Sequence, residues 1–122
     1  MDVGAANVSQ VMAAYTRALR QLSDRLQLQM AWNQLLVDAM ESEVSLHHAL
    51  MSLESSRYCL EMTRQLAAFE KHRFDMRAGI ARILRAQGLS NPEIADTFGV
   101  SRQLMHRIMA EEARVALEVN LA

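Results

Sequence analysis

The chain has 122 residues, of which 51% are hydrophobic and 22% are charged, and its formal net charge is −1. This length excludes large catalytic folds such as a TIM barrel, and the hydrophobic content excludes a chain that is disordered throughout. Only four glycines and one proline are present, so the turn residues that a β-protein needs are scarce and an all-α fold is predicted.

The sequence shows no pattern typical of export or membrane insertion. No apolar run approaches the roughly 18 residues of a membrane-spanning helix, and the first ten residues, MDVGAANVSQ, do not resemble a signal peptide. The single cysteine excludes an internal disulfide and a multi-cysteine zinc site. We therefore expect a cytoplasmic protein with no membrane partner.

Charge is distributed unevenly along the chain. Residues 1–70 hold five basic and eight acidic side chains, residues 71–110 hold seven basic and three acidic, and residues 111–122 hold one basic and three acidic. The middle segment is the basic one, and such asymmetry indicates an anionic partner there.

The front half of the chain is predicted to be helical over residues 10–70, because Gly and Pro are absent from Ala5 to Ala78. Ser9 is a candidate N-cap for a helix that opens at the next residue, and residues 1–9 are predicted to be disordered.

A single helix of about 60 residues would be roughly 90 Å long, so a break is expected. Ser42–Ser45 and Ser55–Ser56 are the candidate positions, and a break at either gives an antiparallel helical hairpin or coiled-coil-like region. A hairpin has little to bury its apolar face against except its twin, which predicts a homodimer. The predicted interface residues follow helical spacing: Leu19, Leu22, Leu26, Leu36, Met40, Met51 and Tyr58.

The segment from residue 76 to 110 contains a strongly specified helix start. An amphipathic helix should end at Gly88, since glycine adopts the left-handed conformation cheaply. Ser90 and Glu93 then have the spacing of a capping box, and Leu89 and Ile94 that of a hydrophobic staple. Pro92 in the first helical turn is consistent with this start.

The helix that follows is predicted to be short, from Asn91 to about Phe98. It should stop at the turn residue Gly99, and Ser101 is a second candidate N-cap for a helix from Arg102 onward.

The stretch GLSNPEIADTFGVSRQLMHRIM resembles the helix-turn-helix of prokaryotic DNA-binding proteins, and is similar to the units of bacterial sigma-factor region four, quorum-sensing regulators and resolvases. The match covers about 22 residues, or 35 with the preceding helix. A small residue allows close helix approach, a glycine makes the turn, and apolar residues fill the core. The residues at these positions are Ala95, Gly99, Val100, Met105 and Ile108.

The resemblance implies that the second helix of the motif enters the major groove of double-stranded DNA and that the protein is nucleoid-associated. Arginine and glutamine can grip guanine and adenine edges. The implied base-reading residues are Arg102, Gln103, His106 and Arg107. The implied phosphate-binding residues are Asn91, Ser101, Arg82 and Arg85.

Other features are predicted to be structural. His47 and His48 are adjacent, so they point about 100° apart on a helix and cannot easily share a metal ion. Cys59 is expected to be buried as a small hydrophobe. No catalytic motif is visible, so we expect neither an enzyme nor a bound metal or cofactor.

The predicted architecture is an all-α protein with a long helical dimerisation region at 10–70, a three-helix DNA-binding unit at 71–110, and a C-terminal tail at 111–122. A helix is favoured over a strand for the tail because no breaker separates it from the recognition helix. The predicted function is a small dimeric transcriptional regulator. The alternative is an adaptor in which the helix-turn-helix binds a sigma factor, polymerase or another protein of the transcription machinery.

Overall fold

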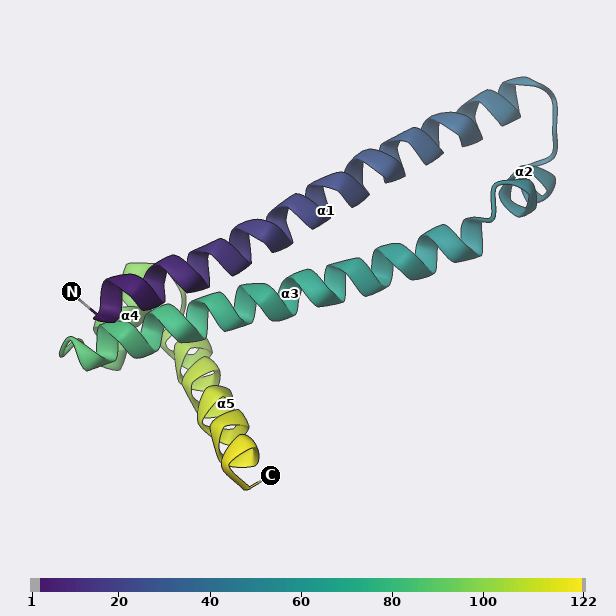
Figure 1. The fold of residues 1–122 in the computed structure, drawn as a ribbon. Helices are drawn as coiled ribbons and strands as arrows, with labels where there is room; N and C mark the ends of the chain where they lie inside the picture. The colour runs from purple at the N-terminus through teal and green to yellow at the C-terminus, as the bar shows by residue number, and fades with distance from the viewer. Residues whose placement is uncertain (1–2, 122) are drawn as a thin grey trace. The chain divides into compact units, whose positions relative to one another are not determined.

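The computed structural model describes residues 3–121, with side chains for residues 8–114, 117 and 118. The described range contains five α-helices and no strand, which confirms the all-α class (Figure 1). The helices are α1 (Val3–Glu41), α2 (Leu46–Ser52), α3 (Ser55–Ala86), α4 (Asn91–Phe98) and α5 (Arg102–Leu121). The chain divides into two compact units: unit 1 comprises Met1–Tyr15 and His72–Ala122, and unit 2 comprises Thr16–Lys71.

Unit 2 is an antiparallel hairpin of α1 and α3 with the short helix α2 between them (Figure 1). The chain turns at two places, and only the first is a predicted break, Ser42–Ser45; the prediction of a break at Ser55–Ser56 is wrong, because both serines are helical and begin α3. The first follows α1 and ends at Ser45, whose side chain caps α2 by accepting a hydrogen bond from the His48 amide at 3.2 Å. The second lies at Glu54, directly before α3 begins at Ser55.

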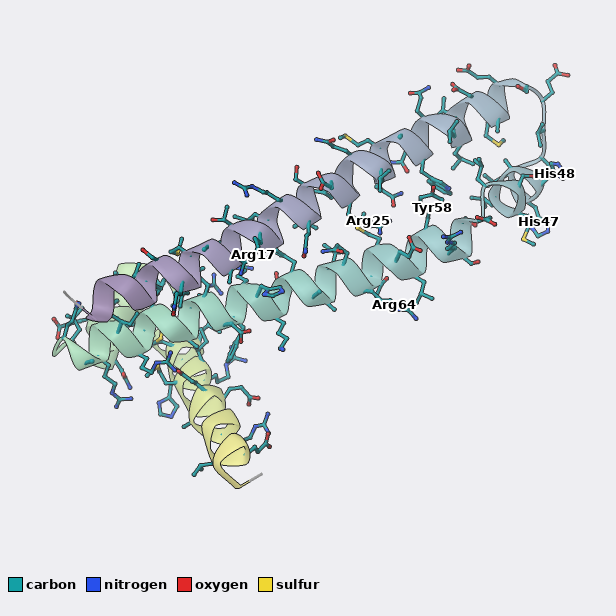
Figure 2. All side chains as sticks on the ribbon, in the orientation of Figure 1. Arg17, Arg25, His47, His48, Tyr58 and Arg64 are labelled. Atoms are coloured by element: carbon teal, nitrogen blue, oxygen red, sulfur yellow. The ribbon has the colours of Figure 1, made fainter. Side chains whose placement is uncertain are left out.

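The hairpin is held by contacts between its two arms. The indole of Trp32, which is 8% exposed, donates a hydrogen bond to the carbonyl oxygen of Leu53 at 3.0 Å, and its ring centroid lies 5.9 Å from that of Tyr58. Arg25 forms an ion pair with Glu61 at 3.0 Å. Figure 2 shows Arg25 and Tyr58 between α1 and α3. These contacts join residues far apart in the sequence and so fix the pairing of the two arms.

Unit 1 has a small core built around Ala81, Ile94, Ala95 and Met105, all fully buried. Leu84, Leu89, Phe98, Val100 and Met109 pack against this core. The core therefore joins the end of α3 to α4 and to the first turns of α5.

The N-terminal part of α1 corrects a prediction. The helix begins at Val3, so Ser9 lies inside it and is not its N-cap, and the prediction of disorder for residues 1–9 is wrong from Val3 onward. Residues 1 and 2 lie outside the described range. Residues 3–9 continue the part of α1 that packs on α3, where Val11 Cγ2 lies 3.2 Å from the place that a Cβ on Gly79 would occupy. The missing side chain lets α1 pack closely on α3 within unit 1.

The C-terminal tail continues α5. α5 runs without interruption from Arg102 to Leu121, which confirms the helical prediction over the strand. Glu112 of the tail pairs with Arg82 of α3, and it lines a small cavity together with Val11 of α1.

Candidate nucleic-acid interface

The start of α4 has the capping box that the sequence predicts. The Glu93 amide donates to Ser90 Oγ at 3.4 Å, and the Ser90 amide donates to Glu93 Oε1 at 3.1 Å. The Ser90 amide, and second the Ser90 hydroxyl, which donates to the same carboxylate oxygen at 2.8 Å, hold the pKa of the Glu93 carboxyl below its usual value. Leu89 packs against the core that contains Ile94, as a hydrophobic staple would.

The turn between α4 and α5 depends on Gly99. This residue has φ 67°, in the left-handed region, and its amide donates to the Asp96 carbonyl at 3.1 Å. The Val100 amide donates back to the Ala95 carbonyl, also at 3.1 Å, which completes a Schellman motif. Ser101 then caps α5 by accepting a hydrogen bond from the Leu104 amide at 3.0 Å. The chain therefore reverses within three residues, as a helix-turn-helix requires.

The predicted motif core lies where close helix packing requires it. Ala95 and Met105 are fully buried and Ile108 is 3% exposed. Val100 is half-buried against the same cluster, whereas Gly99 is exposed at the turn. Because these residues are buried, they fix the orientation of α5 against α4.

The outer face of α5 presents the four predicted base-reading side chains. Arg102, Gln103, His106 and Arg107 are exposed and together line one open hollow of about 540 Å³. Counted from Arg102, the other three follow at one, four and five residues, which places all four on one side of the helix. Among the residues whose side chains are described, neither arginine of this face forms an ion pair with a carboxylate. We call these four residues the α5 reading face.

The predicted phosphate ligands differ in their surroundings. Arg85 is exposed in the last turn of α3, and Ser101 is exposed at the start of α5. Asn91 is half-buried, and its Oδ1 has no hydrogen-bond partner. Arg82 pairs with Glu112 at 2.5 Å, so its charge is compensated within the chain. Arg85 and Ser101 are therefore the better placed candidates.

A carboxylate network that was not predicted follows the reading face along α5. Arg114 forms ion pairs with Glu111 and Glu118, and these bonds lower the pKa of Glu111 and raise that of Arg114. The i,i+3 and i,i+4 spacing of these residues could have revealed the network. Because Arg114 is compensated, the uncompensated arginines of α5 lie in its first two turns.

The predicted dimer residues fall into two groups. Leu22, Leu36 and Tyr58 are half-buried. The other group is exposed, at 40 to 67% of the residue surface: Leu19, Leu26, Met40 and Met51.

Three further residues singled out by the sequence, His47, His48 and Cys59, are exposed. His47 and His48 lie exposed on α2 (Figure 2), and no group of three or more potential metal ligands occurs among the described residues. Cys59 is exposed, so the expectation that it is buried is wrong; it lies on a face of α3 that the hairpin does not cover. Within the described residues, no helix is both long enough and apolar enough to cross a membrane.

Comparisons with protein-family models, with curated proteins and with solved structures found no match to this chain.

Proposed function

We propose that this chain is a sequence-specific, duplex DNA-binding protein that acts as a small dimeric transcriptional regulator. One observation carries the proposal. Four exposed side chains able to bond with base edges share one face of a helix, and that helix is oriented by a buried helix-turn-helix core.

In this proposal α5 lies in the major groove. Arg102 is suited to bidentate bonds with guanine O6 and N7, and Gln103 to bonds with adenine N6 and N7. His106 and Arg107, one turn further along, reach neighbouring bases or phosphates. Arg85 contacts the phosphate backbone and adds affinity that does not depend on sequence.

The proposed protein is a homodimer, so two reading faces contact one DNA site. A symmetric pair of motifs reads two half-sites, and their spacing is set by the dimer. Binding should then be nanomolar for a specific duplex at physiological salt.

Selection from a random duplex pool at about 150 mM salt tests the proposal, because this condition suppresses purely ionic binding. We expect enrichment of a motif with two half-sites. A single half-site would retain DNA binding and contradict the dimer. If the folded protein enriches no sequence, the regulator proposal is wrong and the adaptor alternative is favoured.

Substitution of Arg102 gives the matching test at one residue. Arg102→Ala should cost about 1–3 kcal/mol on the selected site and relax specificity at one base pair. Arg64→Ala is the control, because Arg64 is also exposed but lies on unit 2, where it points away from α1 (Figure 2). Equal losses from the two variants would mean that only net charge matters.

A further inference from the structure

An exposed apolar stripe runs along α1 within unit 2. Leu19, Leu26, Met30 and Val37 are 42, 46, 63 and 49% exposed. They follow one another at steps of seven, four and seven residues, so at 100° per residue they lie within about 40° of each other around the helix. We call these four residues the α1 stripe.

The α1 stripe is not used by the packing of the hairpin. The buried residues Ala18 and Trp32 lie about 100–140° away around α1, on the face that packs within unit 2. Contiguous exposed apolar residues at this spacing are typical of a helix that packs against a second helix. The stripe is therefore available to an occupant other than the described parts of unit 2.

We infer that the occupant is a second copy of this chain, packed with the two α1 stripes antiparallel. The stripe is symmetric in sequence about residue 28. An antiparallel pair centred there places Leu19 opposite the partner's Val37 and Leu26 opposite the partner's Met30. A two-fold axis requires a surface that complements itself, and this stripe meets that requirement.

The charge pattern of α1 favours the same orientation. Residues 16–28 carry three arginines and one aspartate, whereas residues 29–41 carry two acidic residues and no basic one. Antiparallel packing brings the basic half of one helix against the acidic half of the other. Parallel packing would place like charges together, which is unfavourable.

Two residues make this complementarity specific. Arg20 and Asp38 are both exposed, and no ion pair is formed by either among the described side chains. They are eighteen residues apart, which is five full helical turns, so they lie on the same side of α1. In the antiparallel pair Arg20 approaches the partner's Asp38, and the two-fold axis forms this contact twice.

This inference rests on the dimer of the proposed function and supplies its interface, but it involves no residue of the α5 reading face. Oligomeric state can therefore be measured without DNA. If the α1 stripe does not form a dimer, DNA selection can still enrich a single half-site. If the protein does not bind DNA, selection enriches no sequence, whatever the oligomeric state. The two failures are therefore distinguishable.

Sedimentation equilibrium of the full chain tests the interface. The double variant Leu26→Glu/Met30→Glu should raise the dimer dissociation constant by at least about 100-fold, because it places unpaired carboxylates in the apolar contact. Leu28→Glu/Leu35→Glu is the matched control. These leucines are 51 and 53% exposed on the opposite side of α1, and the control should remain dimeric. Circular dichroism shows whether each variant remains helical.

Charge reversal tests the interface without changing the apolar contact. Arg20→Glu should weaken the dimer by about tenfold, and the double variant Arg20→Glu/Asp38→Arg should restore it. Because both positions are exposed, these variants remain informative if the stripe variant fails to fold.

Cysteine crosslinking in a Cys59→Ser background tests the orientation. Leu19→Cys alone should not crosslink, since the two positions would be roughly 27 Å apart along the axis. Leu19→Cys/Val37→Cys should form covalent dimers on oxidation. A monomeric wild-type chain, dissociation by the control variant alone, or crosslinking by Leu19→Cys alone would overturn the inference.

Discussion

The two units of the molecule close their helix turns with different residues. In unit 1 the positive-φ residues that end α3 and α4 are glycines, Gly88 at φ 100° and Gly99 at φ 67°. In unit 2 the corresponding residues are glutamates, Glu43 at φ 62° and Glu54 at φ 53°. A glutamate carries a steric cost in this conformation that glycine does not. The turns of unit 1 are therefore less strained than those of unit 2.

The units also differ in how completely they bury apolar side chains. Unit 1 fully buries the large side chains of Ile94 and Met105, whereas the buried residues of unit 2 are Trp32 and two alanines. Most of the large hydrophobic residues that are at least 40% exposed belong to unit 2. Unit 1 therefore has the larger apolar core, and unit 2 leaves more of its apolar surface exposed.

Truncation of a core side chain should produce the largest difference between the units. Ile94→Ala should reduce the free energy of unfolding by about 2–5 kcal/mol, because it opens a cavity in the fully buried core. Leu28→Ala on the exposed side of α1 should change it by no more than about 0.5 kcal/mol. Urea denaturation followed by circular dichroism measures both. Similar losses would contradict the assignment of the core.

The contact between the arms of unit 2 should have an intermediate effect. Trp32→Phe keeps an aromatic ring near Tyr58 but removes the hydrogen bond to the Leu53 carbonyl. We expect a loss of about 1–2 kcal/mol in the same denaturation measurement. An unchanged stability would mean that water replaces the indole N–H as the donor to the Leu53 carbonyl without loss of free energy.

Substitutions at two positive-φ turn residues should change the stability of the protein in opposite directions. Gly99→Ala should destabilise the protein by about 1 kcal/mol, because alanine is strained at φ 67°. Glu54→Gly should stabilise it by about 0.5–1 kcal/mol by relieving the same strain. Thermal melting of the two variants beside the wild type is sufficient. Destabilisation by both would show that the Glu54 side chain contributes more than its backbone strain costs.

The capping box should give the smallest effect, and one that depends on pH. The pKa of Glu93 is lower in the folded protein than its usual value of 4.5. The ionised carboxylate therefore stabilises the fold above pH 4.5, and this stabilisation is lost as the pH falls through the lower pKa of the folded state. Glu93→Gln should therefore melt below the wild type at pH 6, and the difference should shrink towards pH 3. A difference in melting temperature that does not change with pH would show that the effect does not come from the charge of the carboxylate.

The turn between α4 and α5 and the start of α4 were predictable because their information is local. A capping serine, a glutamate three residues later and a turn glycine specify α4 and both of its ends within eleven residues, 89 to 99. The resemblance then identified two buried side chains of α5, Met105 and Ile108. The ion pair of Arg82 with Glu112 was not predicted, because the two residues lie on different helices and only the packing of α5 beside α3 brings them together.

The sequence by itself predicted the all-α class, the break at Ser42–Ser45 and both ends of α4, since these follow from the scarcity of turn residues and from capping over short distances. Only the tertiary structure decided that the first residues of α1 belong with unit 1, through the contact of Val11 with Gly79. It also separated the apolar residues of α1 into a buried face and an exposed stripe. Periodicity marks a residue as apolar on a helix, but the partner helix decides which apolar residues it covers.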